Sequence, residues 1–195
     1  MSQFRRLSFF LHRMRYNAFL ASTSCLCLGC AYTTEMKDEL LIGFKTYIEP
    51  SADQNHALAR VTGQGVFVAY PQSKCTSPAV ERSGLALHSS GIGIRASSLN
   101  GQKREMLQGS ESNLPAAEMR IPSDQPFTLH YRASWPSGTQ VITCNAVRTF
   151  TPKKDSQYEV RGVTDHVGNT CGVLVNEISP AKVEVPTIAA LRCAA

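Results

Sequence analysis

Short β-rich runs recur along the chain from Leu58 to the carboxyl end, and no other pattern limits the choice of fold as strongly. They return about every ten residues with Gly, Pro, Asn or Asp between them, a spacing typical of sandwiches and barrels. Residues 57–195 have no convincing helical periodicity. We therefore predict an all-β domain over 57–195, an immunoglobulin-like two-sheet β-sandwich of about seven to nine strands.

Two connections in this region are typical of β-hairpins. Asn100-Gly101 is the dipeptide that tight two-residue turns favour, and Gly63-Gln-Gly65 separates two runs in a similar way. We predict a hairpin at each. The paired runs are 92–97 with 103–107 and 60–62 with 66–70.

The run Phe127–Ala133 alternates strictly between apolar and polar residues, which predicts a half-buried strand with one wet face. The inward set is Phe127, Leu129, Tyr131 and Ala133, and the outward set is Thr128, His130, Arg132 and Ser134. Further strands are predicted at 118–121, 140–150, 158–163, 171–178 and 181–185.

The first 29 residues have the features of an export signal. A basic stretch without acidic residues precedes an uncharged apolar run, Ala18–Gly29, and the first acid of the chain is Glu35. A buried or amphipathic amino-terminal helix is the alternative. Met14 offers a second start site that would give a more compact signal.

The apolar run ends in Leu26-Cys-Leu-Gly-Cys30, which looks like a bacterial lipobox. In a lipobox the final cysteine is diacylated and becomes the new amino terminus, so Cys30 is the predicted lipidation site. Cys27 replaces the usual aliphatic residue, and ordinary signal cleavage near 21–24 is the alternative. A redox or zinc role for the Cys27–Cys30 pair is disfavoured, because zinc would need two more ligands.

These features predict a signal peptide over 1–29, a tether over 30–56 and the β-domain over 57–195. Ala31 follows the predicted acylated cysteine, and the likeness to Gram-negative lipoproteins then implies the periplasmic face of the outer membrane. A soluble periplasmic or secreted protein is the alternative location.

Most of the formal charge of +5 comes from the signal, which holds four of the twenty basic residues and none of the acids. The rest of the chain is near neutral. Its only lysine doublet, Lys153-Lys154, is followed at once by Asp155 and is typical of a solvated turn. We therefore expect no nucleic-acid partner.

Four cysteines lie in the predicted domain: Cys75, Cys144, Cys171 and Cys193. Four cysteines allow three pairings, and export permits disulfides. In a simple meander Cys144 and Cys171 would lie about 10 Å apart, beyond the roughly 7 Å that a bridge tolerates. A Cys144–Cys171 bridge therefore requires the chain to cross between sheets at Thr151–Gln157. We favour this bridge, and Cys75–Cys193 follows by elimination; the alternative is free buried thiols.

The predicted domain shows no clear catalytic or metal-binding motif. The histidines that follow the predicted signal, 56, 88, 130 and 166, do not pair at ligand spacing. His88 adjoins Ser89, but neighbours on a strand point to opposite faces, which disfavours a nucleophilic serine. We expect no catalytic residue, no metal and no cofactor, and thus a protein that is not an enzyme.

Trp135 is the only tryptophan, and it lies at a predicted strand end beside a turn. Packing at the rim of the core is the plainer interpretation. The sharper one is an exposed aromatic anchor for a partner.

Residues 100–178 carry a frame of short motifs: Asn100-Gly101, Glu118-Met-Arg-Ile121, Gln125-Pro126, Thr143-Cys144, Phe150-Thr-Pro152, Tyr158-Glu159 and Cys171-Gly-Val173. This frame resembles a group of small predicted lipoproteins from Proteobacteria with no assigned activity. Cys193 lies outside it. The resemblance implies a signal, a lipobox and a β-rich domain, and it transfers no catalytic residue.

The first hypothesis is thus a non-catalytic binding or scaffolding lipoprotein of the cell envelope, with an envelope protein or a glycan as its partner. The second is a periplasmic or secreted inhibitor or adhesin-like module without a lipid anchor. The third is an envelope enzyme on a β scaffold.

Overall fold

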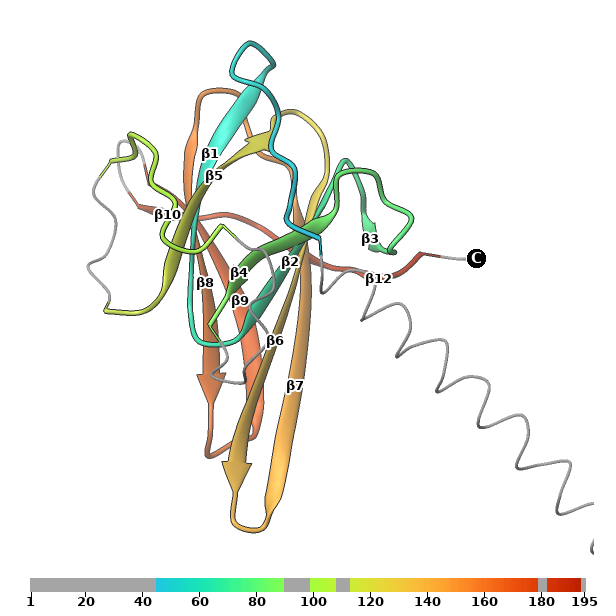
Figure 1. The fold of residues 1–195 in the computed structure, drawn as a ribbon, viewed down its shortest axis with the longest axis vertical. Helices are drawn as coiled ribbons and strands as arrows, with labels where there is room; N and C mark the ends of the chain where they lie inside the picture. The colour runs from blue at the N-terminus through green and yellow to red at the C-terminus, as the bar shows by residue number, and fades with distance from the viewer. Residues whose placement is uncertain (1–44, 90–98, 108–112, 179–181, 194–195) are drawn as a thin grey trace, which may run out of the picture. The chain divides into compact units, whose positions relative to one another are not determined.

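The computed structural model describes residues 45–89, 99–107, 113–178 and 182–193, and these form an all-β sandwich (Figure 1). No helix occurs among the described residues. The strands are β1 (His56–Thr62), β2 (Val66–Pro71), β3 (Cys75–Thr76), β4 (Gly84–His88), β5 (Ala116–Pro122), β6 (Phe127–Ser137), β7 (Gln140–Phe150), β8 (Gln157–Asp165), β9 (Thr170–Glu177), β10 (Val183–Glu184), β11 (Ile188–Ala189) and β12 (Leu191–Arg192).

Two five-stranded sheets enclose the core. One has the order β10-β9-β8-β1-β5 and the other β11-β7-β6-β2-β4, while β12 and β3 form a separate two-stranded sheet. Strand β1 runs parallel to β8, and the remaining pairs within the two large sheets are antiparallel. The two-sheet all-β prediction is confirmed.

The carboxyl-terminal segment 182–193, here called the strap, touches all three sheets. Its strand β10 pairs with β9, β11 pairs with β7, and β12 pairs with β3. The strap therefore ties the edges of both large sheets together.

The predicted hairpin around Gly63-Gln-Gly65 is wrong. Strands β1 and β2 belong to different sheets, so these residues cross the sandwich instead of turning back. Gly65 has φ +123, and a Cβ there would lie 2.3 Å from the carbonyl oxygen of Arg132. The glycine is needed because the backbones approach closely, which its sequence neighbours do not reveal.

The predicted strand at 103–107 is also wrong. This segment lies along β5 as a loop, where Glu118 N–H donates to Gln102 O at 2.9 Å and Gly101 N–H donates to Ala116 O at 2.9 Å. The glutamate side chain also accepts the backbone N–H of Arg104. Backbone hydrogen bonds to β5 and the carboxylate of Glu118 hold this loop, and they take the role that a strand ladder would otherwise have. The partner run 92–97 lies outside the described residues.

The inward face of β6 is confirmed, since Phe127, Leu129, Tyr131 and Ala133 are all buried. The outward face is not uniformly wet. Thr128 is 0% exposed, and its hydroxyl donates to Ser73 O at 2.6 Å and bonds the hydroxyl of Thr149. The segment after β2 covers this end of the strand.

A chain of aromatic contacts crosses the sandwich. The Phe127 and Phe150 rings of one sheet lie 6.0 Å apart, and Phe150 meets Tyr158 of the other sheet at 5.2 Å. Tyr47, which is 2% exposed, joins the chain at 6.0 Å from Phe127. Residues 45–55 belong to the predicted tether. The Tyr47 ring and the bridge between Thr46 and Leu85 nevertheless place part of this segment against the sandwich.

Both predicted disulfides are present. Cys144 on β7 and Cys171 on β9 have Cα atoms 6.0 Å apart, and Cys75 and Cys193 have Cα atoms 5.0 Å apart. Because β7 and β8 lie in different sheets, the chain does cross between sheets over 151–156, as the first bridge requires.

We predict that Gly162→Ala destabilises the domain. A Cβ at Gly162 would lie 2.6 Å from the ring of Tyr131 and 2.9 Å from that of Phe67, whose stacked centroids are 4.6 Å apart. Overpacking of this kind costs about 1–3 kcal/mol. Urea unfolding measures the loss, with Gly172→Ala as a comparison at a glycine whose added Cβ would meet only the Val163 side chain, at an ordinary 3.4 Å. An unchanged unfolding midpoint for Gly162→Ala would contradict the packing described here.

Candidate functional site

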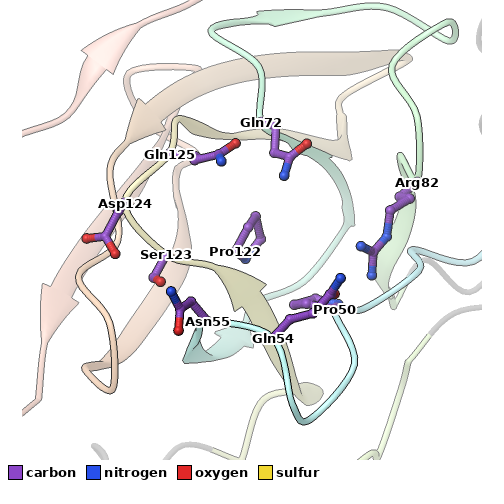
Figure 2. Close-up of a pocket in the computed structure, with 9 residues that line it drawn as sticks. All are labelled: Pro50, Gln54, Asn55, Gln72, Arg82, Pro122, Ser123, Asp124 and Gln125. Carbon is purple, nitrogen blue, oxygen red and sulfur yellow. The ribbon is translucent and has the colours of Figure 1, made fainter.

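The loops at one end of the sandwich surround a polar pocket, which we call the amide pocket (Figure 2). Its volume is about 340 Å³, near the lower end of ordinary small-ligand sites. The side chains form a ring around Pro122 in Figure 2. The lining residues are Pro50, Gln54, Asn55, Gln72, Arg82, Pro122, Ser123, Asp124 and Gln125.

Four segments that are distant in the sequence contribute to this pocket. The segment 50–55 leads into β1, Gln72 follows β2, Arg82 precedes β4, and 122–125 connects β5 to β6. Loops carried on a rigid sandwich are the usual location of binding residues. The fold therefore assembles the pocket from elements that the sequence keeps far apart.

Three of its lining residues have left-handed backbone conformations without being glycine. These are Gln72 at φ 55, Arg82 at φ 63 and Asp124 at φ 59. Such conformations cost free energy for residues other than glycine and cluster at functional sites. The described ranges contain five such residues, so three of the five lie around one pocket.

Hydrogen bonds fix the pocket walls. The Arg82 guanidinium donates to the carbonyl oxygens of Ile48, at 3.2 Å, and of Glu49. Asp124 N–H donates to Pro152 O at 2.7 Å, and Gln54 Oε1 accepts the Ser51 N–H at 3.1 Å. Two nitrogens of the guanidinium are thus held by the protein's own backbone.

Ser123 is the least satisfied group of the pocket. It is 6% exposed, and its hydroxyl has no hydrogen-bond partner among the described residues. A buried hydroxyl without a partner lowers the stability of the folded state, because it loses its hydrogen bonds to water and gains none in return. The Ser123 hydroxyl therefore has hydrogen-bonding capacity that a ligand could use.

Asp53, next to the pocket-lining Gln54, and Glu177, at the end of β9, have lowered pKa values. A hydrogen bond from Ser51 lowers the pKa of Asp53. Beside the chain crossing, a hydrogen bond from Ser156 lowers the pKa of Glu177, with Lys153 reinforcing the shift. The same contact with Glu177 raises the pKa of Lys153. These acids are charged at neutral pH and serve as acceptors, so they stabilise the loops and are poor proton donors.

The residues singled out in the sequence lie elsewhere. Cys30 lies outside the described residues. Trp135 is only 7% exposed, so the exposed-anchor interpretation is wrong and the rim-packing alternative is right; His166 covers its indole face with ring centroids 5.0 Å apart. The Ser89 hydroxyl donates to the backbone oxygens of Gly63 and Gly65, and has a structural role in the chain crossing.

Within the described part of the chain, no group of three or more His, Cys, Asp or Glu side chains lies close enough to hold a metal ion. Among the same residues, no helix of the length and hydrophobicity needed to cross a bilayer is found. No protein-family model, curated protein or solved structure matches this chain.

Sequence inspection missed every amide of the pocket. Gln and Asn have no spacing rule that marks a binding site, and non-glycine residues in the left-handed region leave no reliable trace in a sequence. The one available signal was Ser123-Asp-Gln125 between two prolines, which indicates a turn but no ligand.

We predict that Ser123→Ala stabilises the domain in the absence of ligand. The change removes a buried hydroxyl that has no partner, a group whose desolvation costs about 1–3 kcal/mol. Thermal unfolding should therefore show a raised midpoint. Thr128→Ala, which removes a hydroxyl with two partners, should lower the midpoint in the same assay. A lower midpoint for Ser123→Ala would mean that its hydroxyl is satisfied.

Proposed function

We propose that this chain is a non-catalytic binding lipoprotein of the cell envelope. Its Cys30 would carry the lipid, and the amide pocket would bind an uncharged, hydroxyl-rich ligand, which is the chemistry of a sugar residue. The resemblance of residues 100–178 to predicted proteobacterial lipoproteins supports the envelope location. The pocket itself supports the binding role.

The observation that carries the binding role is the composition of the pocket. Gln54, Asn55, Gln72 and Gln125 each combine donor N–H groups with an acceptor oxygen. Sugar hydroxyls also donate and accept, so amides satisfy them in both directions. Arg82 directs two of its guanidinium nitrogens to backbone carbonyls, and Asp124 adds a carboxylate to the same lining, so the charged groups of the pocket are of both signs and do not select an anionic ligand.

The backbone conformations of Gln72 and Asp124 support the same proposal. Both residues are held in a costly conformation beside the cavity, and the hydrogen bond from Asp124 N–H to Pro152 O keeps its loop in place. A preformed site of this kind binds without paying to order its loops.

Lipid anchoring is tested by Cys30→Ala. Two acyl chains bury enough methylene groups for stable membrane attachment, so the variant should move from the membrane fraction to the soluble fraction. The intact mass of the wild-type protein should also include the lipid. Cys25→Ala is the control, because it lies in the predicted signal but outside the lipobox. Unchanged membrane association of Cys30→Ala, or a mature mass without lipid, would support the secreted or periplasmic alternative.

Ligand binding is tested with a panel of neutral mono- and disaccharides by ligand-observed NMR. We expect binding to the wild-type protein and a loss of about tenfold or more in Gln72→Ala/Gln125→Ala, since two hydrogen bonds of about 1 kcal/mol each are removed. Gln140→Ala, an exposed glutamine on β7, is the matched control. Equal affinity in the double variant, or no binding of any saccharide, contradicts the proposed ligand class.

A further inference from the structure

Trp135 is buried with one unmet requirement. It is 7% exposed, lies near the end of β6 opposite Ile142 of β7, and its indole N–H has no hydrogen-bond partner among the described residues. Buried tryptophan N–H groups usually have a partner. The indole nitrogen is one of five buried side-chain polar atoms that have no hydrogen-bond partner among the described residues.

A single exposed ring covers this indole. The imidazole of His166 is stacked on it, with centroids 5.0 Å apart and ring planes only 8° from parallel. His166 lies on the turn between β8 and β9, which Asp165 closes by accepting the N–H groups of Val167 and Gly168. The imidazole itself is held by a 3.2 Å hydrogen bond between its Nε2 and Thr164 Oγ1. The turn thus fixes the backbone of His166, while one hydrogen bond and the stacking contact hold its exposed side chain.

The stacked pair adjoins a groove of about 500 Å³, within the range of small-ligand sites. The groove opens between β6 of one sheet and the end of β8 in the other. Besides Trp135 and His166 its lining includes Gln64, Arg132, Ser134 and Thr164. Trp135 gives this groove an aromatic floor, and the other residues place polar groups at its margin. Such a lining suits a flat ring that carries a polar substituent.

We infer that this groove is a second binding site, which takes a flat aromatic ring bearing a hydroxyl in place of the His166 imidazole. The parallel stack already shows which geometry the indole accepts from a partner ring. His166 then acts as an internal cover that a ligand displaces, and the polar margin receives the hydroxyl. This inference does not depend on the amide pocket.

The test uses p-cresol, which has the ring and hydroxyl of a tyrosine side chain, and the full chain. Trp135 is the sole tryptophan, so its emission reports on the groove directly. We expect p-cresol to change this emission in the wild-type protein and to bind His166→Ala about tenfold more tightly, because no side chain must then be displaced. Thr164→Val, which loosens the imidazole, should have an intermediate affinity. His130→Ala, a histidine bonded to Asn145 outside the groove, should match the wild-type protein.

Equal affinity of the wild-type protein and His166→Ala would overturn the role of the histidine as a cover. Absence of p-cresol binding to both, or binding of methyl glucoside in its place, would overturn the aromatic ligand class. Ligand-observed NMR with Trp135→Phe gives an independent readout, in which p-cresol binding should persist because the stacking floor is retained.

Discussion

The contact between Phe150 and Tyr158 joins the two large sheets at the point where the chain passes from β7 in one sheet to β8 in the other. The two rings face each other across the sandwich at 5.2 Å, and only residues 151–156 separate the strands that carry them. This crossing brings β7 beside β9, so that Cys144 reaches Cys171. It also supports the amide pocket, because Pro152 accepts the N–H of Asp124.

The sequence predicted the layers of this fold better than its connections. Alternation along 127–133 and the runs at 140–150, 158–163 and 171–178 correspond to β6, β7, β8 and β9, because side-chain burial follows strand periodicity directly. The crossing at Gly63-Gln-Gly65 could not be told from a hairpin, since glycines that allow a close backbone approach look the same in a sequence as glycines of a turn. The strand predicted at 103–107 is a loop because buried Glu118 binds its backbone.

The candidate sites were harder to predict than the strands. The Cys144–Cys171 bridge could be argued from strand spacing, because a disulfide has a fixed reach. Trp135 is the only tryptophan, which made it a candidate in the sequence. Its stack with His166, however, depends on the meeting of two strands from different sheets, and no local sequence pattern encodes that meeting. The two sites lie at opposite ends of β2 and β6, so each can change in sequence without disturbing the other.

The nesting of the two disulfides has a consequence for biogenesis. The Cys144–Cys171 bridge lies wholly inside the loop closed by Cys75 and Cys193. A chain that emerges from its amino end presents Cys75 to Cys144 long before Cys193 exists. Oxidation in order of appearance would therefore give the wrong bridge, and the native pairing requires either delayed oxidation or an isomerase that reopens early errors. Because Cys193 lies in the strap, the larger loop closes only after the strap has been synthesised.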